Sequence, residues 1–174
     1  MLEHFGKLLD TVPFAKTRPG ITALTIRAVD SSEAPLEEHD LRSAPATPEG
    51  CTTLARVHEQ ADCCYEAKAH WDLWSSESGS AKLAPQPVEI TCNGEEYDAG
   101  AFREAGHFSV ELGPEDLFVG TARSAGGSQP RQNARALQTW VQQVRAALPV
   151  ERISLWSEGE EDFEAHLDGA LANS

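Results

Sequence analysis

The longest regular pattern in the chain lies between residues 63 and 74, where apolar and polar residues alternate. Successive residues of a β-strand point to opposite faces of a sheet, so this pattern predicts a half-buried strand. Its length favours a central position in the sheet. The polar residues would form one row, with about 7 Å between successive side chains. They are Glu66, Lys68, His70, Asp72 and Trp74.

Shorter patterns predict further strands and one hairpin. β-branched or alternating residues indicate strands at 21–29, 88–92, 108–112 and 150–156. The dipeptide Asn93-Gly94 tolerates the two positive φ angles of a type I′ turn. It therefore predicts a hairpin whose short second strand is residues 95–97.

Helical spacing of apolar residues predicts four helices, at residues 2–11, 48–60, 130–148 and after Ser157. The second helix would begin with Thr47 as its N-cap, followed by a proline at the first helical position. The third is the most regular, because its apolar residues recur every three or four positions. The strand and helix phases place Trp71 and Trp140 in the core. Trp74 and Trp156 fall on the opposite faces.

Segments rich in Pro, Ser, Gly or acidic residues predict surface loops at 30–47, 75–86 and 120–129, the last of them a candidate mobile loop. None of them separates two regions that could each build a core, so residues 1–174 should form a single domain. Clustered strands with helices at both ends favour an α+β fold. We expect a mostly antiparallel or mixed sheet of about five to six strands, with helices packed on one face.

The balance of charge narrows the choice of partners. The chain has 174 residues, with 14 Lys and Arg against 28 Asp and Glu, and a formal net charge of −14. Such a field repels nucleic acids and anionic membranes, because their phosphates are bound mainly by Lys and Arg. It favours encounter with a basic protein. We therefore expect no nucleic-acid and no membrane partner.

The sequence also bears on compartment and thiol chemistry. It shows no export signal and no apolar stretch long enough to span a membrane, so a soluble, cytoplasmic protein with reduced cysteines is expected. We interpret Cys51, Cys63 and Cys92 as small buried hydrophobes. Cys64 falls on the polar side of its strand and is the candidate for an exposed, reactive thiol. It points away from Cys63, so no metal site is expected.

Motifs for catalysis are absent from the sequence: it contains no G-x-S-x-G, H-E-x-x-H or S-x-x-K. The row from Glu66 to Trp74 is then the candidate functional face, and a solvated sheet face with cross-strand ion pairs is its simpler explanation. We predict a non-catalytic acidic protein that binds a basic protein, in the manner of an immunity protein or an adaptor, which it matches in size and charge only.

The alternative is a small-molecule-binding protein or enzyme that uses Glu66, His70 and Asp72. This alternative requires that the three side chains line a pocket and converge on one point. No cofactor or metal is expected in either case. Homodimerisation through an edge strand or a Trp-bearing face is compatible with both.

Overall fold

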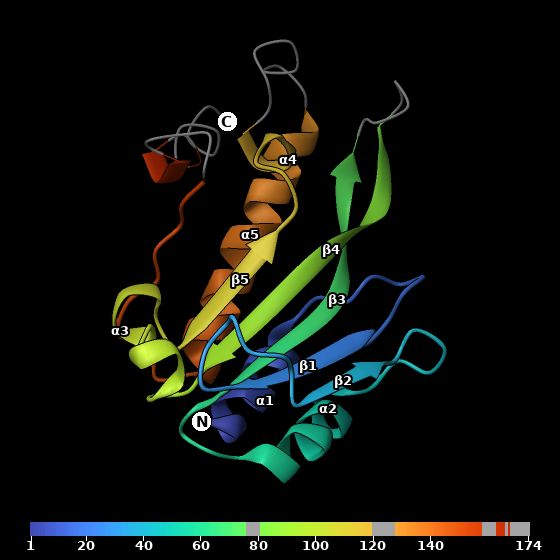
Figure 1. Ribbon diagram of the computed structural model, residues 1–174. Helices are drawn as coiled ribbons and strands as arrows, with labels where there is room; N and C mark the ends of the chain where they lie inside the picture. The colour runs from blue at the N-terminus through green and yellow to red at the C-terminus, as the bar shows by residue number, and fades with distance from the viewer. Residues whose placement is uncertain (76–80, 120–127, 158–162, 166, 168–174) are drawn as a thin grey trace.

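Strand pairing organises the fold into one antiparallel sheet (Figure 1). The computed structural model describes residues 1–75, 81–119, 128–157, 163–165 and 167. In order across the sheet the strands are β2 (Glu37–Asp40), β1 (Ala23–Ala28), β3 (Cys63–Ser75), β4 (Lys82–Asn93) and β5 (Phe108–Leu112). Every neighbouring pair is antiparallel. The predicted α+β class, single domain and central position of the 63–74 strand are confirmed.

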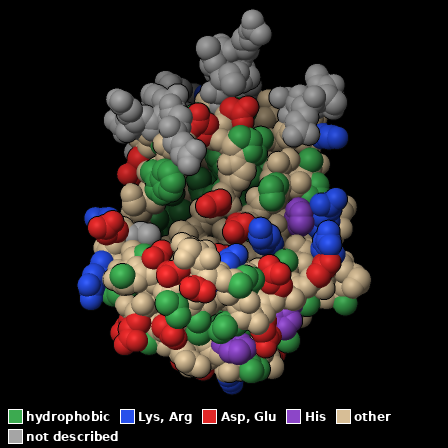
Figure 2. Space-filling view, in the orientation of Figure 1, with side chains coloured by type: hydrophobic (Ala, Val, Ile, Leu, Met, Phe, Trp, Pro, Cys, Tyr) green, Lys and Arg blue, Asp and Glu red, His purple; other side chains and the backbone are tan. Residues whose placement is uncertain are grey.

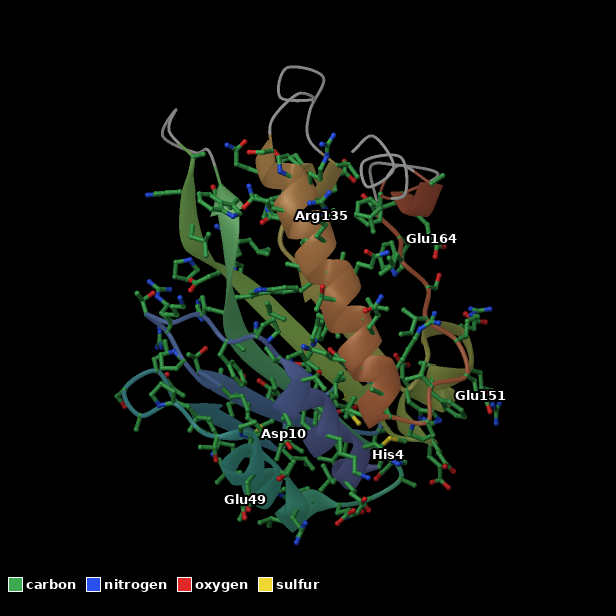
Figure 3. The ribbon with its side chains drawn as sticks, turned by 180° about the vertical axis from the view of Figure 1, so that it is seen from behind. His4, Asp10, Glu49, Arg135, Glu151 and Glu164 are labelled. Atoms are coloured by element: carbon green, nitrogen blue, oxygen red, sulfur yellow. The ribbon has the colours of Figure 1, made fainter. Side chains whose placement is uncertain are left out.

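Helices cover one face of this sheet. They are α1 (Leu2–Thr11), α2 (Pro48–Ala55) with the 3₁₀ turn η1 (Arg56–His58), and α5 (Ser128–Ala147). α1 and α5 lie behind the sheet in Figure 1 and in front of it in Figure 3, and α2 packs against α1 at the lower end of the molecule. Short turns η2 (Tyr97–Ala99), α3 (Phe102–Ala105) and α4 (Asp116–Val119) complete the described elements. The prediction that helices pack on one face is therefore confirmed. The predicted N-cap at Thr47 is also confirmed, because its Oγ1 accepts a hydrogen bond from the Gly50 amide. The long helix predicted near the C-terminus is α5.

The core lies between the sheet and these helices, and two tryptophans join its layers. Trp71 of β3 and Trp140 of α5 meet edge to face, with ring centroids 5.7 Å apart. The Trp140 indole Nε1 donates to Thr11 Oγ1 of α1 at 3.0 Å, so its polar atom is satisfied although the ring is buried. Both tryptophans occupy the core as the sequence predicts.

The backbone of β3 is longer than its neighbour β1, and other groups complete its pairing. β4 runs along one edge for the whole length of β3, but β1 reaches only to Lys68. Beyond that point the Ala15 amide donates to the His70 carbonyl at 2.7 Å. Further along, the side chain of Asn133 in α5 accepts from the Trp74 amide and donates to the Trp74 carbonyl, both at 2.9 Å. Asn133 thus replaces a neighbouring strand.

Two of the predicted loops contain strand residues. The 30–47 segment includes β2, because the backbone of residues 37–40 pairs with β1 although the strand has no apolar residue. The 75–86 segment includes the first half of β4. Residues 76–80 of this segment lie outside the described residues. The Asn93 amide donates to the His107 carbonyl on the β5 side, so by alternation along β4 the nitrogens of Pro85 and Pro87 also point away from β3. β5 pairs with β4 only from Val88 onward, so neither proline removes a ladder bond.

The predicted hairpin at Asn93-Gly94 is wrong. β4 ends at Asn93, and the chain enters the 3₁₀ turn η2 instead of a second strand. Gly94 serves a different purpose, because a Cβ on this residue would lie 2.2 Å from the Ala61 carbonyl oxygen. The glycine allows the chain to pass close to the segment that leads into β3.

The C-terminal predictions are only partly tested. Residues 150–156 form no strand; they run as an extended segment whose Val150, Ile153 and Leu155 pack against the core. Trp156 is 73% exposed. Most of the predicted last helix lies outside the described residues, as does the 120–127 part of the predicted loop 120–129, whose last two residues begin α5.

Asn133 provides a test of how the end of β3 is held. Its side chain is 2% exposed and also donates to the Leu117 carbonyl at 2.8 Å. Replacing Asn133 by Leu removes three hydrogen bonds and leaves backbone groups unpaired, so we expect the free energy of unfolding to fall by about 2 to 4 kcal/mol. Chemical denaturation measures the change. Gln138→Ala, at an exposed position of the same helix, is the control and should change stability by less than about 0.5 kcal/mol; an equal effect of both substitutions would contradict this role.

Candidate functional site

The candidate row on β3 lies on the face of the sheet that the described helices leave uncovered. We call this surface the open face. Along β3 the apolar positions are buried and those of the row are exposed or half-buried. Figure 2 views the molecule from this side, with a hollow near the centre and acidic side chains spread over the lower half of the view, which also includes α2 and the loops below β2. The sequence thus placed all five side chains on the correct side: Glu66, Lys68, His70, Asp72 and Trp74.

Four members of the row, namely Glu66, Lys68, Asp72 and His70, each have a separate structural partner. Glu66 pairs with Arg27 of β1 at 3.4 Å, and Lys68 pairs with Glu89 of β4 at 3.0 Å. The Asp72 carboxylate accepts from the backbone amide of Lys16 at 2.9 Å. Partners taken from different neighbours hold these groups apart. The arrangement is that of a cross-strand charge network and does not bring the titratable groups to one point.

His70 is held as a neutral imidazole. Its Nε2 lies 3.2 Å from Nη1 of Arg18, and a guanidinium can only donate, so Nε2 accepts and the proton is assigned to Nδ1. Nδ1 is buried and has no partner among the described residues. Burial, and then the charge of Arg18, lower the pKa of His70 below its ordinary value. An imidazolium at this position would be repelled by Arg18.

An excess of carboxylates surrounds Lys68. Its pKa is raised by the hydrogen bond to Glu89, and Glu66 and Glu111 add favourable charge interactions. Glu89 and Glu111 lie directly opposite each other on β4 and β5. Like charges in this register repel, and among the described residues Arg27 on Glu66 together with Lys68 on Glu89 leaves one of the three acids without a balancing cation. The open face therefore has a local surplus of negative charge.

The hollow on the open face has a volume of about 540 Å³ and is open to solvent. Four strands contribute to its walls, together with Thr22 and Arg42 beside them. The charged and imidazole side chains that line it are Glu38, His39, Asp40, Arg42, Lys68, His70 and Glu89. Of the three residues that the enzyme alternative needs, only His70 lines this hollow. Glu66 and Asp72 lie outside it, so the structure does not bring the three together.

A second acidic surface, which the sequence did not single out, lies where three loops meet at one end of the sheet. The Val29 amide donates to the Asp62 carbonyl at 3.0 Å, and the Val29 carbonyl accepts from the Asp98 amide at 2.8 Å. Val29 has a φ of 70° and is 58% exposed, although β-branched residues rarely adopt this conformation. The acidic residues of these loops are Asp30, Glu33, Glu59, Asp62, Glu95, Glu96 and Asp98.

The expectation of an exposed thiol at Cys64 is wrong. Cys64 is 1% exposed; its Sγ lies 3.4 Å from Oδ1 of Asn93, where it donates to the amide oxygen. The alternation of β3 places Cys64 on the polar side, but the chain around Asn93 covers that end of the strand. Burial raises the pKa of Cys64 to about 12. Cys51, Cys63 and Cys92 are buried as predicted.

These burials predict that the folded protein has no reactive thiol. Burial also raises the pKa of Cys51 and Cys92 to about 12, so almost no thiolate forms near neutral pH. With Ellman's reagent at pH 8 we expect no rapid release of chromophore from the native protein. All four cysteines should react once the chain is unfolded in guanidinium. One thiol that reacts rapidly in the native state would contradict the burial of these side chains.

Searches of the chain against protein-family models, curated proteins and solved structures give no match. Within the described ranges, no helix combines the length and apolar character that a membrane crossing needs. The same part of the chain holds no group of three or more His, Cys, Asp or Glu side chains arranged to hold a metal ion.

Proposed function

We propose that this protein binds another protein, one of basic character, through the open face and catalyses no reaction. The observation that carries this proposal is the uncovered face itself. Helices pack on one side of the five strands, while the other side presents a charged surface with a hollow at its centre. A surface of this kind fits an adaptor or an immunity-like inhibitor, proteins that act by binding. The cytoplasm stays the predicted compartment.

The separate pairing of the row on β3 supports binding over catalysis. A general acid or base needs a pKa near the working pH and a position close to the reacting atom. Here Glu66 and Lys68 are in ion pairs, Asp72 holds a backbone amide and His70 is held by Arg18. Their roles are accounted for by the sheet and the loop beside it.

The charge distribution supports a basic partner. The net charge of −14 favours encounter with a positive surface. On the open face, Glu89 and Glu111 repel each other across the β4–β5 pair, and a Lys or Arg from a partner would relieve that repulsion. The acidic loops at the end of the sheet extend the same sign of charge.

The small-molecule alternative keeps one supporting observation. The hollow of about 540 Å³ is within the usual size range of ligand sites, and His70 lines it. Its openness to solvent and the absence of Glu66 and Asp72 from its walls weaken this alternative. Homodimerisation through an edge or a Trp-bearing face likewise stays a prediction.

An affinity-capture experiment with matched charge variants tests the proposal. The wild-type protein is immobilised beside an open-face variant, Glu89→Gln with Glu111→Gln, and exposed to a lysate of the cells that make it. We expect a basic protein to be retained by the wild type and lost from the variant, because the variant removes the surplus charge. Retention should also weaken as salt is raised, since the ion pairs are near the surface.

The control variant also loses two negative charges, but they are taken from the helical side of the molecule. Asp10→Asn with Glu49→Gln changes α1 and α2, which carry these residues in Figure 3. This variant should retain the partner as the wild type does. Equal retention by all three proteins, or loss from the helix-side variant alone, would contradict binding through the open face.

A further inference from the structure

The outer edge of the sheet at β2 has backbone groups that no described strand pairs with. β2 is first in the strand order, and among the described strands it is hydrogen-bonded to β1 alone. In the β1–β2 register Leu41 lies opposite Thr22, and the Leu41 amide donates to the Thr22 carbonyl at 3.0 Å; Glu37 and His39 lie four and two residues from Leu41. Backbone groups alternate in direction along an antiparallel strand. Glu37 and His39 therefore point toward β1, whereas the N–H and C=O groups of Glu38 and Asp40 point outward.

The two faces of β2 differ in what their side chains do. On the side of the helices, Oε1 of Glu37 is hydrogen-bonded to Nε2 of His58 at 3.0 Å, and Oε2 lies 2.7 Å from Nε2 of His39, so both carboxylate oxygens have a close neighbour. Glu38 and Asp40 are on the other side, where both line the hollow. Asp40 is paired with Arg42, whereas Glu38 is in none of the ion pairs found among the described residues. Glu38 thus presents a free carboxylate next to outward-facing backbone groups.

We propose that an extended, basic segment of the partner adds to the sheet as a strand along β2, with Lys or Arg at alternate positions above the hollow. This inference rests on the proposed function and names the partner's binding element. The outward groups of Glu38 and Asp40 supply main-chain hydrogen bonds, as in other cases of strand addition. Cross-strand neighbours lie about 5 Å apart, so alternate side chains of the segment face Glu38 and Asp40.

The other edge of the sheet fits this partner less well. β5 contributes no residue to the hollow, and three of its five residues, Phe108, Val110 and Leu112, pack against the core. It carries a single acidic residue, Glu111, whereas three of the four residues of β2 are acidic. A basic segment therefore has both more charge and more space at β2.

The experiment uses the full chain and two synthetic peptides of about ten residues, the length of a long strand. One peptide alternates lysine with threonine; the other has the same composition with all lysines in one block. Amide hydrogen exchange is followed by NMR. We expect the alternating peptide to slow exchange at Glu38 and Asp40, while the amides of Glu37 and His39, already bonded to β1, stay unchanged. The block peptide should bind more weakly.

Two variants at one position separate the backbone bond from the charge. Glu38→Pro removes the outward N–H and leaves the bonds to β1 in place, a substitution that edge strands tolerate. It should weaken binding of the alternating peptide by about tenfold more than Glu38→Gln, which loses only the charge. Thermal unfolding of both variants is measured so that a loss of fold is not read as a loss of binding.

The outcomes separate this inference from the proposed function. Shifts at Glu89 and Glu111 without protection of Glu38 and Asp40 would overturn strand addition and leave binding through the open face intact. Equal affinity for the two peptides, equal effects of the two variants, or no binding of the alternating peptide would also overturn the inference. Protection confined to Glu38 and Asp40, with the expected order of the variants, supports it.

Discussion

The need of β3 for hydrogen-bond partners along both edges shapes the rest of the structure. An unpaired backbone group costs free energy when it is buried, so each stretch of this long central strand must have a neighbour. β4 satisfies one edge throughout, and on the other edge β1 is followed by Ala15 and then by the side chain of Asn133. This arrangement places the end of α5 against the sheet and brings Trp140 onto Trp71. The helical layer thus follows from how the edge of one strand is completed.

The same arrangement leaves the other face uncovered. The apolar positions of β1, β3 and the second half of β4 are buried on the side of the helices, so the polar positions of these strands form a charged surface on the other side. Because β2 and β1 are short, the loop carrying Arg18 and the turn carrying Arg42 come beside the hollow. Cationic groups there are already held by His70 and Asp40, which leaves the acids Glu38 and Glu111 for a partner. Binding through this face is consistent with the geometry because it requires no convergence of reactive groups.

Local periodicity made part of this structure predictable. The alternation around Tyr65 and Trp71 and the helical spacing in 130–148 depend on residues close in sequence, and both elements are where the pattern indicates. β2 and the first half of β4 were missed because charged residues and prolines have low strand propensity, and pairing with a long neighbour overrides it. Cys64 was misplaced because its cover comes from a distant loop. Asn133 gave no signal, since a polar residue on an apolar helix face has meaning only once its partner strand is known.

Carboxylate footprinting of the complex is the most direct test of binding through the open face. A carbodiimide and an amine label accessible Asp and Glu side chains, and mass spectrometry compares the free protein with the protein bound to its captured partner. The account predicts that Glu38, Glu89 and Glu111 lose reactivity in the complex, while Glu3, Asp10 and Glu49 on the helical side keep it. The reverse pattern, with protection on the helices and an open face that labels as in the free protein, would contradict the account.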